Sequence, residues 1–84
     1  MYFAYILQSE KDGSYYIGST SNLDERIKRH NSRGSGFTKN RIPYKLAYRE
    51  TFSTLSEARK REAYLKSLKS RRAIEKIMNN APFV

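Results

Sequence analysis

A chain of 84 residues without a single cysteine has to fold around its own hydrophobic core, with no disulfide or thiolate framework to support it. A chain this short buries only about 60% of the surface that its unfolded form exposes, so we expect one domain over residues 1–84. The missing cysteines also exclude catalytic-cysteine and zinc-ribbon chemistry and favour a reducing compartment. The longest apolar segment, residues 2–7, is too short for a membrane span and lacks the flanks of a signal peptide. We therefore expect a cytoplasmic protein.

Positive charge is both large and unevenly placed. The formal net charge is +9, and the segment from Arg26 to Arg49 holds eight Lys or Arg residues and no Asp or Glu. A solvated surface normally mixes both signs, so this segment indicates contact with a polyanion. Its middle, residues 32–43, has two glycines and a proline and predicts a basic loop. Nucleic acid is the expected partner, since no predicted helix sets an extensive apolar face opposite its charges as membrane binding requires.

Three segments have the composition of β-strands. Residues 2–8 and 15–19 are rich in Tyr, Phe and Ile and are separated by a turn-forming cluster with an Asp-Gly dipeptide, which predicts a β-hairpin. Residues 44–52 predict a third strand, in which Leu46 and Tyr48 alternate with more polar neighbours and should share one face.

Three helices are predicted over residues 23–31, 54–68 and 71–78, each with one apolar stripe to bury. The second begins at a capping box formed by Thr54 and Glu57. Short strands joined by hairpin-like connections, together with these helices, predict an α+β fold. We expect a small central three-stranded antiparallel sheet flanked by helices.

Counting residues excludes several kinds of chemistry. One histidine and no cysteine cannot assemble a tetrahedral zinc site, and the four glycines form neither a phosphate-binding loop nor a dinucleotide fingerprint. Any metal would need carboxylate, hydroxyl or water oxygens as ligands. That donor set points to magnesium or manganese.

The first predicted helix carries Arg26 and His30 four residues apart, on one face beside its apolar stripe. Two i, i+4 ion pairs are predicted among the neighbouring residues, Asp24 with Lys28 and Glu25 with Arg29. Arg26 has no carboxylate at such a spacing. It is available either for a phosphate oxygen, which suits its forked donors, or for an acid distant in the sequence. His30 is either a site residue or a half-buried structural imidazole.

Glu62 lies along the apolar stripe of the second predicted helix, four residues after Ala58 and three before Leu65. A carboxylate that faces a sheet needs a compensating charge. A metal ion would supply it, and so would an ion pair with Arg59 or Lys66.

Two hairpin tyrosines complete the candidate site. Paired residues of an antiparallel hairpin have a constant index sum, and this turn gives an odd sum, so Tyr5 and Tyr16 should share a face. Their hydroxyls could bind phosphate or position a water, and a phenol could act as a base if a nearby cation lowered its pKa. Strand tyrosines are also common as plain packing residues.

These motifs, in this order and spacing, resemble the GIY-YIG endonuclease domain, most closely its small stand-alone, excinuclease-C-like members. The resemblance covers residues 2–68 and rests on Phe3-Ala4-Tyr5, Tyr16-Ile17-Gly18, Asn22-Leu23-x-x-Arg26-Ile27-x-x-His30-Asn31, Thr38-x5-Tyr44 and Ala58-x3-Glu62-x3-Lys66. It implies the fold expected above, with the active site on the sheet and magnesium or manganese as cofactor. The same domain occurs in homing endonucleases and in subunits of DNA excision repair.

The resemblance also implies a role for each site residue. Glu62 would hold the metal, and Arg26 would bind phosphate and stabilise the transition state. Tyr5 and Tyr16 would be the signature tyrosines, with Tyr5 positioning the attacking water, and His30 would relay a proton. Five basic residues are expected to contact nucleic acid around them: Arg29, Arg33, Lys39, Arg41 and Lys66.

Two positions depart from the family pattern: the first motif has no glycine, and Ile74 stands where many family nucleases have asparagine. The leading hypothesis is a metal-dependent endonuclease that acts on DNA more than RNA. With few base-reading elements in so short a chain, it should recognise structure rather than sequence. The alternatives are a non-catalytic nucleic-acid-binding module of the same fold and a small protein whose basic face docks on an acidic protein.

Overall fold

The computed structural model of the protein describes residues 1–32 and 40–80 and contains the expected strands and helices. In chain order they are β1 (Tyr2–Ser9), β2 (Tyr15–Thr20), α1 (Leu23–Ser32), β3 (Tyr44–Phe52), α2 (Leu55–Ser67) and α3 (Arg71–Asn80). The predicted bounds differ from these by at most two residues. No helix of the described part combines the length and apolarity that crossing a bilayer requires.

The strands form one three-stranded sheet in the order β2-β1-β3, with both pairings antiparallel. This confirms the predicted fold class. Between β1 and β2 the register runs from Phe3 opposite Thr20 to Gln8 opposite Tyr15, so the index sum is odd, as predicted. Strand β1 is central and buries four consecutive residues, Ala4 to Leu7, because both of its faces are covered.

The predicted alternation of Leu46 and Tyr48 on one face of β3 is wrong. The register between β1 and β3 shifts between Ile6 and Leu7, where Ile6 pairs with Tyr48 but Leu7 pairs with Leu46. Such a bulge adds one residue to one strand and reverses the alternation beyond it. Tyr48 therefore packs with Ile6 on one face, and Leu46 packs on the opposite face.

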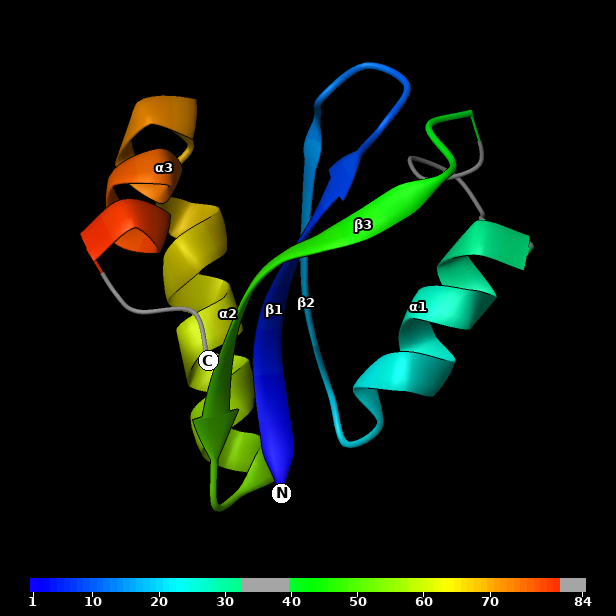
Figure 1. The fold of residues 1–84 in the computed structure, drawn as a ribbon. Coiled ribbons are helices and arrows are strands. Elements are labelled where there is room, and N and C mark those ends of the chain that lie inside the picture. The colour runs from blue at the N-terminus through cyan, green and yellow to red at the C-terminus, as the bar shows by residue number, and fades with distance from the viewer. Residues whose placement is uncertain (33–39, 81–84) are drawn as a thin grey trace.

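Helices cover both faces of the sheet: α1 lies on one side, and α2 and α3 lie on the other (Figure 1). Each interface has its own core. The core beside α1 is built on Tyr5, Leu7, Leu23 and Tyr44. The core beside α2 and α3 is built on Ile6, Tyr48, Leu65 and Ile74.

Side-chain caps fix where the helices begin and end. The predicted capping box of α2 is present: the Thr54 hydroxyl accepts from the Glu57 backbone N–H at 3.2 Å, and the Glu57 carboxylate accepts from the Thr54 N–H. At the other end of the molecule, the Asn31 side chain accepts from the Tyr44 N–H at 2.6 Å and donates to the Tyr44 carbonyl at 3.0 Å. Asn31 thus ties the last turn of α1 to the start of β3.

Candidate active site

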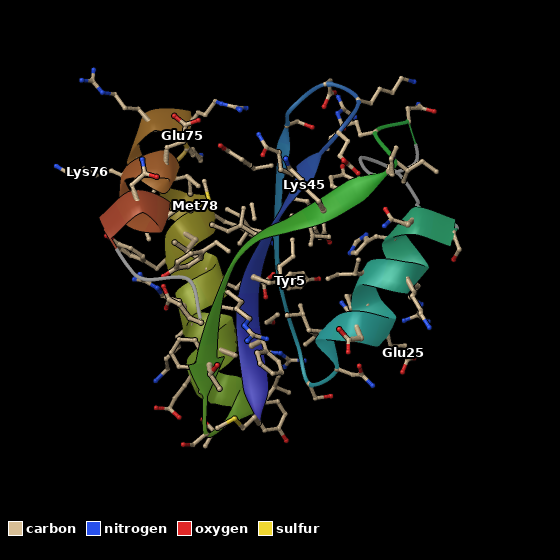
Figure 2. All side chains as sticks on the ribbon, in the orientation of Figure 1. Tyr5, Glu25, Lys45, Glu75, Lys76 and Met78 are labelled. Atoms are coloured by element: carbon tan, nitrogen blue, oxygen red, sulfur yellow. The ribbon has the colours of Figure 1, made fainter. Side chains whose placement is uncertain are left out.

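Tyr5 lies at the centre of the candidate site, in the middle of the molecule between the sheet and α1 (Figure 2). Tyr5 is fully buried and pairs with Gly18 of β2. A Cβ placed on Gly18 would lie 2.5 Å from the Tyr5 hydroxyl oxygen and 2.7 Å from Cζ. The phenol therefore crosses β2 directly over Gly18, and only glycine leaves it room. The glycine of the second sequence motif, Gly18, thus leaves space for the tyrosine of the first motif, Tyr5.

Tyr16 packs beside Tyr5 on the face of α1, and His30 packs against Tyr16. Tyr16 pairs with Leu7 and so shares the face of Tyr5, which confirms the prediction from the hairpin register. Its ring meets the His30 ring edge-on, with 4.7 Å between centroids, and the His30 ring lies 6.1 Å from that of Tyr44. The i, i+4 spacing of Arg26 and His30 on α1 places both residues against this cluster.

The Tyr5 hydroxyl is a neutral phenol in this environment. Burial raises its pKa to about 12, although the charge of Arg26 acts in the opposite direction. Tyr16 and the negative charge of Glu62 raise the pKa further. Three of the predicted site residues, Arg26, Tyr16 and Glu62, therefore lie close enough to affect this hydroxyl. Its oxygen is buried and forms no hydrogen bond of normal geometry with another described residue, although the Arg26 guanidinium lies close enough to lower its pKa. It is suited to holding a water rather than to acting as a phenolate base.

His30 is held in its neutral form. Burial lowers its pKa, and the positive charges of Arg26 and Arg29 lower it further. Its Nε2 atom is buried, and no described residue forms a hydrogen bond with it. A neutral imidazole with an unused nitrogen can accept a proton near neutral pH.

Arg26 makes no ion pair within the described ranges. This agrees with the absence of a carboxylate three or four residues away in the sequence. The two ion pairs predicted beside it, Asp24 with Lys28 and Glu25 with Arg29, do not form. Instead Glu25 caps the helix with Asn22, whose side chain accepts from the Glu25 N–H at 3.1 Å. Arg26 and Arg29 both line a polar pocket of about 150 Å³ at the start of α1. Two guanidinium groups beside one pocket suit an anion such as phosphate.

Glu62 approaches β2 from the opposite face, on α2. Its carboxylate accepts a hydrogen bond from the Ser19 hydroxyl at 2.5 Å and pairs with Lys66 Nζ at 2.7 Å. The ion pair with Lys66 was one of the two alternatives left open by the sequence. Burial acts to raise the pKa of Glu62, but the hydrogen bonds from Lys66 and Ser19 outweigh it, and the pKa is lowered. The group is therefore ionised at neutral pH.

Ser19 is the site residue that sequence reasoning missed. It pairs with Ala4, so it lies on the face that α2 covers, one residue after the glycine under Tyr5. Adjacent strand residues point to opposite faces. Gly18 thus leaves room for Tyr5 on one face of β2, and Ser19 donates a hydrogen bond to Glu62 on the other face. The hairpin register that places Tyr16 beside Tyr5 also places Ser19 on the opposite face, toward α2. The position of Ser19 could therefore have been predicted from the same register.

The donor set fits a weakly held hard cation. Among the described residues no group of three or more His, Cys, Asp or Glu side chains lies close enough to share a metal ion. Glu62 supplies a single ionised carboxylate, and water and substrate oxygens would supply the remaining ligands. Magnesium keeps several waters and is commonly held by one or two carboxylates together with phosphate. Such a cation would have to compete with Lys66 for the carboxylate.

The residues predicted to contact nucleic acid divide into two groups. Arg33 and Lys39 lie outside the described residues. Arg29 is exposed beside the α1 pocket, Lys66 is exposed beside Glu62, and Arg41 Nε forms an ion pair with Asp12 at 3.2 Å. Ile74, which stands where the resemblance led us to expect an asparagine, is buried in the core beside α2 and α3.

Comparison with known proteins shows the family of this chain. Residues 1–76 match the GIY-YIG catalytic domain. A UPF0213 protein of Bacillus licheniformis is 46% identical over 80% of this chain and 69% of its own length. A UPF0213 protein of Clostridium perfringens is 42% identical over 96% of this chain and 87% of its own. The solution NMR structure of a UPF0213 protein from Bacillus halodurans is 37% identical, covers 94% of this chain and 84% of its own, and superposes with a TM-score of 0.59. The chain belongs to the GIY-YIG catalytic domain family.

Proposed function

We propose that this protein is an endonuclease that uses one magnesium or manganese ion to hydrolyse phosphodiester bonds of DNA. The family indicates a nuclease, and the observation that supports metal-dependent cleavage is the arrangement around β2. An ionised Glu62 reaches this strand from one face, and the neutral Tyr5 hydroxyl crosses it on the other. Arg26, which has no ion pair among the described residues, lies close enough to that hydroxyl to lower its pKa, and a neutral His30 packs against Tyr16.

Each residue then has one task in the reaction. Arg26 binds a nonbridging oxygen of the scissile phosphate and stabilises the charge that develops there. Tyr5 holds the attacking water by its hydroxyl, and Tyr16 packs against His30 to fix the imidazole. His30 accepts the water proton as the new phosphorus–oxygen bond forms and the bond to the leaving oxygen breaks. A cation held by Glu62 would polarise the phosphate and help to stabilise the leaving oxygen.

We propose that DNA structure, rather than sequence, directs cleavage. The cationic groups around the site suit phosphates, which position a nucleic acid without reading its bases. Few elements of so small a chain remain to enter a groove and read base edges. A flap, branch or nick is therefore the preferred substrate, and the work would be done by one cytoplasmic domain with a role in DNA repair.

A second function, nucleic-acid binding without cleavage, is favoured by one observation. Both oxygens of Glu62 already have partners, Ser19 and Lys66. If no cation displaces Lys66, the basic surface would still bind DNA, but the site would lack its metal.

Cleavage assays on a substrate panel separate the two functions. Labelled single-stranded, duplex, flapped and branched DNAs and an RNA hairpin are incubated with the protein in magnesium, in manganese and in chelator. The nuclease predicts cutting that requires a divalent ion and is fastest on branched or flapped DNA. Binding without cutting across the panel would contradict the nuclease and support the binding module.

A further inference from the structure

An open groove of about 450 Å³ runs along β2, between this strand and the junction of α2 and α3. It adjoins the candidate active site on the face that α2 covers, because Lys66 lines it and forms the ion pair with Glu62. From there it continues away from Glu62 toward Ser14 at the start of β2 and Arg71 at the start of α3. Its volume is in the range of pockets that hold small organic ligands.

The groove combines an apolar floor with a basic rim. Ile17, Leu65 and Ile74 supply the floor, and they belong to the core beside α2 and α3. Lys66, Lys69 and Arg71 supply the rim. A flat base joined to a phosphate is complementary to apolar surface bordered by cations.

Arg71 is fixed in place before any ligand binds. Its guanidinium lies 4.3 Å from the centre of the Tyr15 ring, its Nη1 donates to the Gly13 carbonyl at 2.8 Å, and its Nε donates to Glu75 at 3.2 Å. Glu75 lies on α3 at the same end of the molecule (Figure 2). A guanidinium has five N–H donors, so these two bonds leave others for an anion, and the side chain stays 53% exposed.

Lys69 occupies a backbone position that normally favours glycine. It follows the last residues of α2 with a φ of 49°, in the left-handed region. Helices often end on such a residue, and glycine is preferred there because a Cβ is strained. A lysine at this point on the rim indicates that its side chain is needed, since strain of this kind gathers at functional positions.

We propose that this groove binds an unpaired nucleotide of the DNA strand next to the scissile phosphate, with its base on the apolar floor and its phosphates on Lys66, Lys69 and Arg71. The inference rests on the proposed nuclease function, because it extends the substrate from the same site. A base inside a duplex is stacked on both faces and cannot lie against the floor. The groove therefore explains a preference for flaps or loops over plain duplex.

Binding in chelator, where no cleavage is expected, tests the basic rim. Anisotropy measures the affinity for flapped and plain duplexes over a range of salt. We compare Lys69→Gly with Arg72→Ala, which removes the same charge from a neighbouring residue that does not line the groove. Lys69→Gly should weaken flap binding and lower the slope of log affinity against log salt by about one. The same variant should melt at a higher temperature, because glycine relieves the strained backbone. Equal flap binding by the two variants would overturn the proposal.

Abasic substrates test the apolar floor separately. A flap that lacks the base of one nucleotide near the junction should bind at least roughly fivefold more weakly than the complete flap, at one or two positions only. Equal affinity for every abasic position would show that only phosphates are bound and would overturn the assignment of the floor. Since neither assay requires turnover, a failed cleavage assay and a failed groove assay are distinguishable results.

Discussion

Three polar atoms on the α1 side of the sheet are buried without a hydrogen-bond partner in the described part of the chain: Tyr5 Oη, His30 Nε2 and Tyr44 Oη. An unsatisfied buried polar atom costs about 1–3 kcal/mol of folding free energy. Two of the three belong to residues that we propose to act in cleavage. The site thus holds polar groups ready for water and phosphate at a cost in stability.

Replacing Tyr5 with Phe should separate stability from activity. The substitution removes the unpartnered hydroxyl and keeps the ring over Gly18, so the free energy of unfolding should rise by about 1 kcal/mol. The attacking water would lose its anchor, so cleavage should slow by about 100-fold. Urea denaturation and single-turnover cleavage measure the two effects. Tyr64→Phe, at an exposed tyrosine, is the control. A Tyr5→Phe variant that unfolds more easily would show that the hydroxyl has a stabilising partner.

Gly18→Ala should damage the site through contact alone. The new Cβ would lie 2.5 Å from the Tyr5 oxygen and 2.7 Å from Cζ, so the ring would have to move. Overpacking of this kind costs roughly 1–3 kcal/mol, and the displaced tyrosine should also reduce cleavage. Adding Tyr5→Phe should restore only part of the stability, because the contact with Cζ remains. Full recovery in the double variant would mean that the hydroxyl contact alone causes the loss.

The lowered pKa of His30 makes both stability and activity depend on pH. Because the folded protein disfavours the imidazolium, the unfolded chain binds more protons below the usual histidine pKa of about 6.5. The stability due to His30 is therefore present above that pH and is lost as pH falls through the lowered value. Cleavage should fall over the same acidic range, since a protonated His30 accepts no proton. His30→Gln should remove this acidic dependence from the pH–rate profile. An unchanged profile would exclude His30 as the acceptor.

At the scale of elements, Asn31 controls where α1 lies against the sheet. Its side chain accepts a hydrogen bond from the Tyr44 N–H and donates one to the Tyr44 carbonyl. These are the two bonds that a further strand paired with β3 would make at this residue. Asn31→Ala should lower the free energy of unfolding by about 1–3 kcal/mol, because two part-buried backbone groups lose partners. Ser32→Ala, one residue later and exposed, should change it by less than about 0.5 kcal/mol. Similar losses in both variants by urea denaturation would contradict the role of Asn31.

The strands and helices were predictable because their determinants are local. The Asp-Gly turn, the capping box of Thr54 and Glu57 and the apolar periods each act within a few residues. The hairpin register placed Tyr5 and Tyr16 together correctly. The bulge between Ile6 and Leu7 was not predictable, because it arises from the pairing of β1 with a strand almost forty residues away in sequence. The bulge places Leu46 and Tyr48 on opposite faces of β3.

At the scale of the whole molecule, the sequence supplied candidate site residues but not their arrangement. Arg26 and His30 share one helix, so their proximity followed from spacing. Glu62 is a residue of α2, which lies on the opposite side of the sheet from α1 (Figure 1), and its contact with Ser19 depends on how α2 packs across the sheet. The groove along β2 likewise exists only once α3 has packed beside that strand.

The proposed nuclease depends on Glu62 to hold its metal ion, and a charge-removing substitution at this residue tests that role. Single-turnover cleavage of flapped DNA in magnesium is measured for the parent, Glu62→Gln and Glu10→Gln, a control at an exposed carboxylate. Affinity in chelator is measured alongside. Glu62→Gln should cut at least about 100-fold more slowly. The same variant should bind DNA at least as tightly as the parent, while Glu10→Gln behaves like the parent throughout. Cleavage by Glu62→Gln at the parental rate would contradict the account.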